Sequence, residues 1–216
     1  MPAVFKEHKG FWTPARKRSL YLGILLLILA VIIQIVLGRF SARHAAGAPW
    51  VPDLFLDNLP LINLSPVIVG GAIVLWVFAW ILLVVRPRYL LFSIKAIALY
   101  IVSRAFFFSL THVGPYPDQY SPGPHNRGYG LYHLVTFQGN FFYSGHTAFP
   151  FLLALIFWGN KNLRYLFLFL TVLFGASVLL AHVHYSIDVF AAPFIVYGMF
   201  VITKKLFPRD YALFAS

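Results

Sequence analysis

Residues 20–38 read LYLGILLLILAVIIQIVLG and contain no charged side chain. A helix needs about 20 mostly apolar residues to cross the hydrocarbon core of a bilayer, and this stretch has that length. The Ala46-Gly47-Ala48 tripeptide downstream resembles a signal-peptide cleavage site, but the apolar core of a signal peptide spans only about 7–15 residues. We therefore interpret residues 20–38 as an uncleaved transmembrane span.

The same apolar pattern recurs along the chain. Five further stretches are Pro66–Val85, Tyr89–Leu110, Phe141–Trp158, Tyr165–Leu180 and Tyr185–Thr203. Apolar residues make up 60% of the chain and charged residues 11%, whereas a soluble domain is about half apolar and a quarter charged. These features predict an all-α fold: a polytopic six-transmembrane-helix bundle that forms a single integral membrane domain over residues 1–216.

Lysine and arginine are distributed unevenly about these spans. Of the 17 in the chain, thirteen fall on the side of the N-terminus: Lys6, Lys9, Arg16, Lys17, Arg18, Arg86, Arg88, Lys95, Lys161, Arg164, Lys204, Lys205 and Arg209. By the positive-inside rule, both termini are predicted to be cytoplasmic, with residues 1–18 as a basic cytoplasmic segment and residues 111–140 as an outer-face loop. The net charge of +11 then reflects orientation and gives no reason to expect a nucleic-acid partner, because no basic stripe with interleaved polar readers is present.

The histidines follow the opposite distribution. His8 lies on the basic side, and the other seven fall on the opposite side: His44, His112, His125, His133, His146, His182 and His184. Histidine is the side chain best suited to acid–base chemistry near neutral pH. We therefore expect the active site on the non-cytoplasmic side of a multi-pass membrane protein.

The sequence Ser144-Gly145-His146-Thr147 lies near the predicted start of the fourth span. Gly145 lets a backbone approach a ligand closely, and the Ser144 and Thr147 hydroxyls can donate to phosphate oxygens. Free N–H groups at a helix start also attract anions. The alternative is an ordinary N-cap, Ser144 or Thr147, beside an incidental histidine.

The sequence His184-Tyr185-Ser186-Ile187-Asp188 opens the sixth span. On a helix, His184 and Asp188 share a face, so the carboxylate can hold one imidazole nitrogen while the other attacks or accepts a proton. A carboxylate within a span costs about 2.5–3.5 kcal/mol on insertion scales, which favours a functional role over helix capping. Zinc binding by His182, His184 and Asp188 is an alternative, but no further strong ligand is near, so we expect no metal.

Arg104 lies about two turns below the outer end of the third span. A cation at that depth needs an anionic partner. Asp188 or a substrate phosphate would serve, and a purely structural Arg104–Asp188 pair is the alternative interpretation.

These motifs resemble the type 2 phosphatidic acid phosphatase superfamily, whose second motif is P-S-G-H and whose third is S-R-x5-H-x3-D. Ser144-Gly145-His146 matches the core of the second motif, and Ser177, His184 and Asp188 have the spacing of the third. Tyr143 and Val178 stand where that superfamily has Pro and Arg.

The sphingomyelin synthase branch of that superfamily is more similar. It carries S-G-H-T, then H-Y-[ST]-x-D-V, and an Arg followed by six residues and Thr in an earlier span. This chain has SGHT at 144–147, HYSIDV at 184–189, and Arg104 with Thr111. The resemblance covers residues 90–203 and implies a six-span bundle, in agreement with the span count.

The resemblance also implies a mechanism. His184 would attack the head-group phosphorus of a phospholipid to form a phosphohistidine, with Asp188 holding its other ring nitrogen. His146 would protonate the departing lipid alcohol and then act as base for the incoming hydroxyl. Arg104, Ser144, Gly145, Thr147 and Tyr185 would contact the phosphoryl group, and no cofactor or metal is required.

The acceptor decides the reaction class. A lipid alcohol such as ceramide or diacylglycerol makes a phosphotransferase, which we predict, and water makes a lipid phosphate phosphatase or a phospholipase C-type hydrolase. A small transporter that uses Arg104 and Asp188 as an ion relay is the non-enzyme alternative. In the 111–140 loop, candidate substrate contacts are His112, Tyr116, Arg127 and His133. Oligomeric state is left open.

Overall fold

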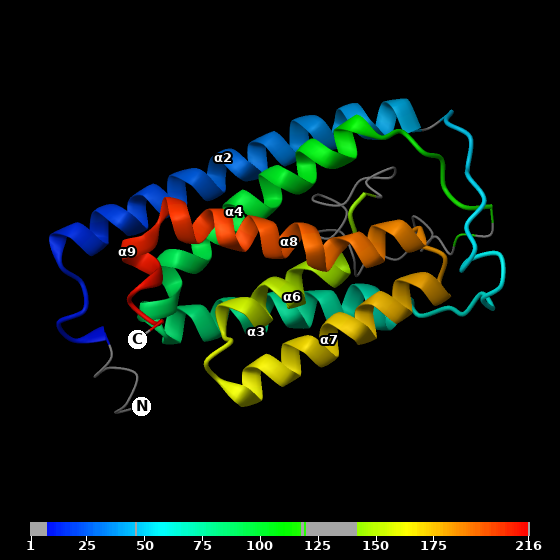
Figure 1. The fold of residues 1–216 in the computed structure, drawn as a ribbon. Helices are drawn as coiled ribbons and strands as arrows, with labels where there is room; N and C mark the ends of the chain where they lie inside the picture. The colour runs from blue at the N-terminus through cyan, green and yellow to red at the C-terminus, as the bar shows by residue number, and fades with distance from the viewer. Residues whose placement is uncertain (1–7, 46, 118, 120–141, 216) are drawn as a thin grey trace.

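The structure is a computed structural model, and it describes residues 8–45, 47–117, 119 and 142–215. Within this part every regular element is helical (Figure 1). The elements are α2 (Pro14–Ala45), the π-helix η1 (Pro66–Gly70), α3 (Gly71–Val85), α4 (Pro87–Leu110), α6 (Gly145–Ile156), α7 (Lys161–Leu180), α8 (Ser186–Leu206) and α9 (Pro208–Tyr211). The all-α prediction is confirmed.

Five of these segments are long and apolar enough to cross a membrane. The predicted first, third and fifth spans are longer in the structure by a few residues, and the sixth begins one residue later and ends three residues later than predicted. The predicted second span, Pro66–Val85, is formed by η1 and α3 together. Pro66 and Pro87 begin their helices, as expected for a residue whose missing N–H is not needed in the first helical turn.

The predicted fourth span is shorter than expected. Phe141 lies outside the described residues, and α6 covers only Gly145–Ile156, about 18 Å at 1.5 Å per residue, which is less than the roughly 30 Å hydrocarbon core. Ser144 caps its start and Phe157 ends it. Almost every residue of α6 after His146 is buried, so this helix lies within the bundle and does not need the length of a lipid-facing span.

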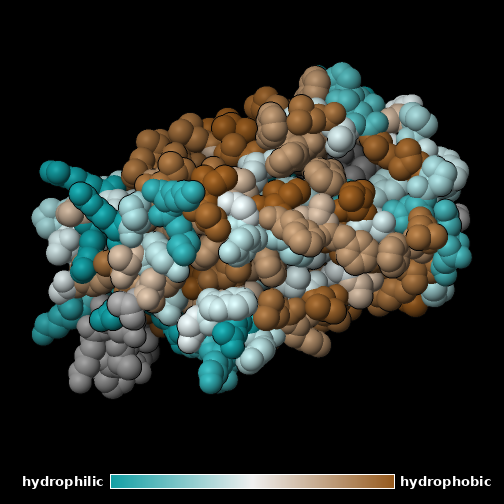
Figure 2. All heavy atoms as spheres, viewed as in Figure 1, coloured by the Kyte–Doolittle hydropathy of each residue, from teal (hydrophilic) through white to brown (hydrophobic). Residues whose placement is uncertain are grey.

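Helix α4 forms the centre of the bundle, and α2 packs along it on the outside (Figure 1). In the most apolar window of α4, 72% of the residues are buried, against 11% in α2. The exposed side of α2 carries Leu25, Ile28, Ile32 and Val36. Figure 2 shows such apolar surface as a broad brown region between two more hydrophilic ends. This is the pattern of a bundle that exposes its middle to lipid.

Both chain ends lie at one end of the bundle, and the segment that joins α2 to η1 lies at the other (Figure 1). At this second end the loop residues Leu56, Leu59 and Leu64 pack against Val178 and Tyr185 in a small apolar cluster of their own. We call this end of the bundle, where residues 47–65 lie, the loop end. It carries the beginnings of α6 and α8, and so the two histidine motifs.

Candidate active site

Ser144 begins α6 by capping it. Its Oγ accepts from the Thr147 backbone N–H at 3.4 Å and from the Thr147 hydroxyl at 3.3 Å. Both residues are buried. Ser144 is therefore an N-cap, as the alternative interpretation of this motif proposed, and His146 lies in the first turn of the capped helix. Phosphate binding by Ser144 and Thr147 stays a prediction.

The turn after α7 delivers His184 to the site. The Val183 N–H bonds to the Val178 carbonyl and the His182 N–H bonds to the Leu179 carbonyl, both at 2.9 Å. With His182 at φ +52°, these bonds form a Schellman motif, the common left-handed ending of a helix. The His182 Nε2 atom lies 3.3 Å from the Leu59 carbonyl oxygen. His182 therefore shapes the turn that precedes His184 and contacts the loop at residue 59.

Asp188 bridges His184 to the first turn of α8. Its Oδ2 lies 3.2 Å from His184 Nδ1 and accepts from the Tyr185 backbone N–H at 3.1 Å. His184 precedes α8, so the two side chains do not meet across a helix face as the spacing predicted. They meet because Asp188, in the first turn, folds back over the helix start. A carboxylate at Nδ1 favours the tautomer with the proton on that nitrogen, so Nε2 is the nitrogen that carries the lone pair.

The two motifs are joined directly. The Ser144 backbone N–H donates to the Asp188 carbonyl at 3.0 Å. The ring centroids of His146 and His184 are 6.0 Å apart, with an angle of 66° between the ring planes. His184 is 5% exposed and Asp188 2%. Two imidazoles, one of them buried against a carboxylate, therefore lie next to each other near the starts of α6 and α8.

Arg104 contacts the same motif from α4. Its Nε donates to the Tyr143 carbonyl at 3.0 Å, at the residue before Ser144. A Cβ at Gly145 would lie 3.2 Å from Arg104 Nε and 3.2 Å from the Tyr100 hydroxyl, so glycine is what allows this approach. Among the residues that the structure describes, the ion-pair partner of Asp188 is His184, not Arg104.

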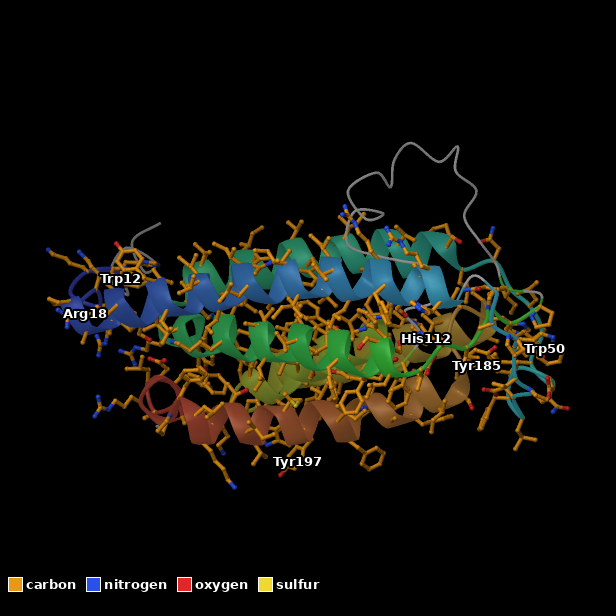
Figure 3. All side chains as sticks on the ribbon, turned by 90° about the horizontal axis from the view of Figure 1, so that it is seen from above. Trp12, Arg18, Trp50, His112, Tyr185 and Tyr197 are labelled. Atoms are coloured by element: carbon orange, nitrogen blue, oxygen red, sulfur yellow. The ribbon has the colours of Figure 1, made fainter. Side chains whose placement is uncertain are left out.

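Tyr185 points to the loops that cover this end (Figure 3). Its hydroxyl donates to the Gly114 carbonyl at 2.8 Å and lies 3.4 Å from the Val51 N–H. The predicted role of Tyr185 in phosphate binding stays a prediction. In the structure its hydroxyl joins two outer segments to the start of α8.

Two of the four predicted substrate contacts in the 111–140 loop, His112 and Tyr116, belong to the described residues. His112 stacks on His44, with ring centroids 5.1 Å apart, and Tyr116 packs edge-on against His182 at 5.2 Å. Arg127 and His133 lie outside the described residues, as does most of the predicted 111–140 loop.

Sequence reasoning missed three side chains that support the site. Tyr143 is fully buried, and its hydroxyl lies 2.8 Å from the Ser103 hydroxyl. The Tyr100 hydroxyl lies 3.5 Å from the Gly145 carbonyl oxygen. Tyr100 precedes Arg104 by four residues in α4, so the two share a helix face, and this spacing is a local signal that could have identified Tyr100 as a site residue. Asp53 accepts from the Ser186 N–H at 2.7 Å. Nothing local indicates this last contact, because the two residues are far apart in sequence.

The arrangement is suited to attack on an electrophile by His184 with proton transfer by His146. In such a reaction Asp188 would stabilise the positive charge that develops on His184, and the Arg104 guanidinium would supply positive charge near the start of α6. Such a set of groups matches the needs of phosphoryl transfer. In the described part of the chain, no group of three or more His, Asp or Glu side chains is arranged to hold a metal ion.

Residues 139–205 match the family model of the PAP2 superfamily C-terminal domain. The matched segment contains both histidine motifs, and the match supports the PAP2 superfamily for this chain. It indicates phosphatase- or phosphotransferase-type activity on phosphate esters. No curated protein matches the chain. The resemblance to this superfamily is thus supported, and the sphingomyelin synthase branch stays a prediction.

Proposed function

We propose that this protein transfers the phosphorylated head group of a membrane phospholipid to a lipid alcohol through a phosphohistidine on His184. The observation that carries the proposal is the His146–His184 pair, whose ring centroids are 6.0 Å apart, with Asp188 Oδ2 3.2 Å from His184 Nδ1. A reacting phosphorus must lie within about 3–3.5 Å of its nucleophile, and two rings at this separation can both reach one phosphate ester.

In the first step, Nε2 of His184 attacks phosphorus, and a P–N bond forms as the P–O bond to the departing lipid-alcohol oxygen breaks. His146 gives its proton to that departing oxygen. In the second step, His146 takes the proton from the acceptor hydroxyl, whose oxygen attacks phosphorus as the P–N bond breaks. Asp188 stabilises the positively charged ring of the intermediate, and Arg104 lowers the energy of the charged phosphoryl oxygens.

The proposed location of the reaction follows from charge and position. The loop end carries both motifs, and the basic residues concentrate at the other end by the predicted span order. The positive-inside rule then puts the loop end on the non-cytoplasmic side. Membrane lipids are the proposed partners, with ceramide or diacylglycerol as acceptor.

The test uses purified protein and a phospholipid labelled in its head-group phosphate, with ceramide or diacylglycerol added. We expect a new labelled phospholipid, and a labelled protein intermediate in wild type after rapid quenching. His184→Ala should abolish both, whereas His146→Ala should lower turnover at least about 100-fold, the usual contribution of a general acid–base group. Turnover that persists in both folded variants would end the enzyme proposal.

Hydrolysis is the second candidate, and the PAP2 match favours it, because that family indicates phosphatase-type chemistry. Water would then take the place of the lipid alcohol in the second step, and the same residues would act. Release of free labelled head-group phosphate, unchanged by added ceramide or diacylglycerol, would identify a hydrolase and refute the transferase assignment.

A further inference from the structure

A cavity of about 570 Å³ lies at the end of the bundle that holds the chain termini. Its lining residues are Lys9, Gly10, Phe11, Arg16, Arg88, Ala212 and Leu213. They come from four places: the segment before α2, the first turn of α2, the first turn of α4, and the chain after α9. The cavity is therefore distant from His146 and His184 and takes no part in the proposed reaction.

The segment that precedes α2 is held in place by specific contacts. His8 Nε2 lies 3.0 Å from the Val84 carbonyl oxygen at the end of α3, and Trp12 Nε1 donates to His8 Nδ1 at 3.3 Å. Gly10 has φ +80°, a left-handed turn that favours glycine, and Phe11 beyond it is buried. This turn places Lys9 at the cavity wall. Figure 3 shows Trp12 and Arg18 at this end, opposite Tyr185.

Arg16 is pre-organised within the cavity wall. Its guanidinium carbon lies 4.5 Å from the centroid of the Phe11 ring, and its Nη1 donates to the Phe11 carbonyl at 2.9 Å. A guanidinium has five N–H donors, so this bond leaves others for a ligand. A planar donor fork held against an aromatic ring is well suited to phosphate oxygens.

Asp210, an acidic residue at this end of the bundle, is already paired with groups outside the cavity. Asp210 Oδ2 lies 2.6 Å from Lys95 Nζ, and both Asp210 oxygens accept from the Ser19 hydroxyl. Within the described residues, none of the cavity cations Lys9, Arg16 and Arg88 forms an ion pair. Three like charges around one hollow repel one another, and an anion in that hollow would relieve the repulsion.

We propose that this cavity binds a phosphate group, namely the head group of an anionic phospholipid in the leaflet at this end of the bundle. Two of the lining residues, Arg16 and Arg88, lie at the starts of membrane-spanning helices, where basic side chains meet anionic lipid head groups. The volume falls within the range of about 300–1,000 Å³ that is usual for ligand sites. The binding is independent of the proposed phosphoryl transfer.

The experiment measures lipid retention by native mass spectrometry of the full-length protein, eluted from phosphatidylcholine nanodiscs with and without phosphatidic acid. All samples carry His184→Ala, so that turnover at the other end does not consume the probe. The cavity variant combines Lys9→Gln, Arg16→Gln and Arg88→Gln. The matched control combines Lys17→Gln, Arg18→Gln and Lys161→Gln, which removes the same charge from exposed positions outside the cavity.

We expect the cavity variant to retain less phosphatidic acid than the control, with affinity reduced about fivefold for each basic residue removed. If the triple cavity variant does not fold, Arg88→Gln alone, at an exposed position, should still lower retention relative to Arg18→Gln.

Inorganic phosphate is added as a competitor. Displacement of the lipid only at phosphate concentrations far above those of the lipid supports a head-group site, and tighter binding of inorganic phosphate than of the lipid would overturn the lipid assignment. Equal retention by cavity and control variants would overturn the proposal itself.

Discussion

At the scale of single residues, one carboxylate oxygen connects helix initiation to the proposed chemistry. Asp188 Oδ2 accepts from the Tyr185 N–H and lies 3.2 Å from His184 Nδ1. From the sequence, helix capping and a contact with His184 were alternative roles for Asp188. In the structure the same oxygen contacts both the Tyr185 N–H and the His184 ring. The position of His184 therefore depends on the start of α8.

We predict that Asp188→Asn separates these two contacts. The Asn carbonyl oxygen can still accept from the Tyr185 N–H, so the helix start should persist, but a neutral amide does not stabilise a charged imidazole. Phosphoryl transfer should fall by about 10³–10⁴, as for loss of the orienting carboxylate in comparable catalytic sites. Initial rates with labelled phospholipid, alongside thermal unfolding, measure both effects. Asp57→Asn, at an exposed carboxylate, is the control; a rate within about tenfold of wild type in Asp188→Asn contradicts the prediction.

At the scale of elements, the start of α8 is held from outside the helix. Asp53 Oδ2 accepts from the Ser186 N–H at 2.7 Å, while its Oδ1 accepts from the Phe55 and Leu56 N–H groups at 2.9 and 3.2 Å. Burial by itself would raise the pKa of the Asp53 carboxyl, but these N–H bonds outweigh it and hold the pKa below its usual value. The loop between α2 and η1 therefore positions the helix that carries Asp188.

We predict that Asp53→Asn destabilises the protein by about 1–2 kcal/mol at neutral pH, because the neutral amide keeps one acceptor oxygen and loses the hydrogen bonds made by the other. Because the folded-state pKa of Asp53 is lowered, its stabilisation is complete above the unfolded value of about 3.9 and is lost as pH falls through the folded value. Thermal unfolding of wild type and Asp53→Asn should therefore differ at neutral pH and converge below about pH 4. A difference that persists unchanged through that acidic range would show that Asp53 acts in some other way.

At the scale of the whole molecule, α4 connects the two ends of the bundle. Near its start Lys95, which is 1% exposed, pairs with Asp210 from α9 and contacts Ser19 of α2. Nearer its end, Arg104 contacts Tyr143 beside the histidine motifs. The buried ion pair ties three segments together at the end that holds the chain termini, far from the proposed chemistry.

We predict that Asp210→Asn lowers the free energy of unfolding by about 3–5 kcal/mol, because it leaves the Lys95 ammonium buried without a counter-charge. The double variant Lys95→Met with Asp210→Asn should recover most of that loss, since no buried charge is left unpaired. Chemical unfolding in detergent measures the three proteins, and the folded fraction of each should keep its rate of phosphoryl transfer. Equal stability of Asp210→Asn and wild type would mean that the pair does not contribute.

The sequence by itself determined the helical class, the approximate positions of the membrane-spanning segments, and the two motifs that the structure brings together. Segment length and hydropathy are local properties, which is why residues 20–38 and Pro66–Val85 could be recognised without any tertiary information. The predicted orientation rests on the distribution of basic residues and stays a prediction. His146, His184 and Asp188 could be named because their residue types and spacing are local too.

Only the tertiary structure decided that the His146 and His184 rings lie 6.0 Å apart, that α6 is a short buried helix, and that Asp53 holds the start of α8. Each depends on how separate segments pack. A short buried helix and a lipid-facing span are both apolar in sequence, so hydropathy could not distinguish α6 from the others. A bond between residues 53 and 186 leaves no periodic signal in the chain, because it forms only when the helices have packed and the loop has closed over them.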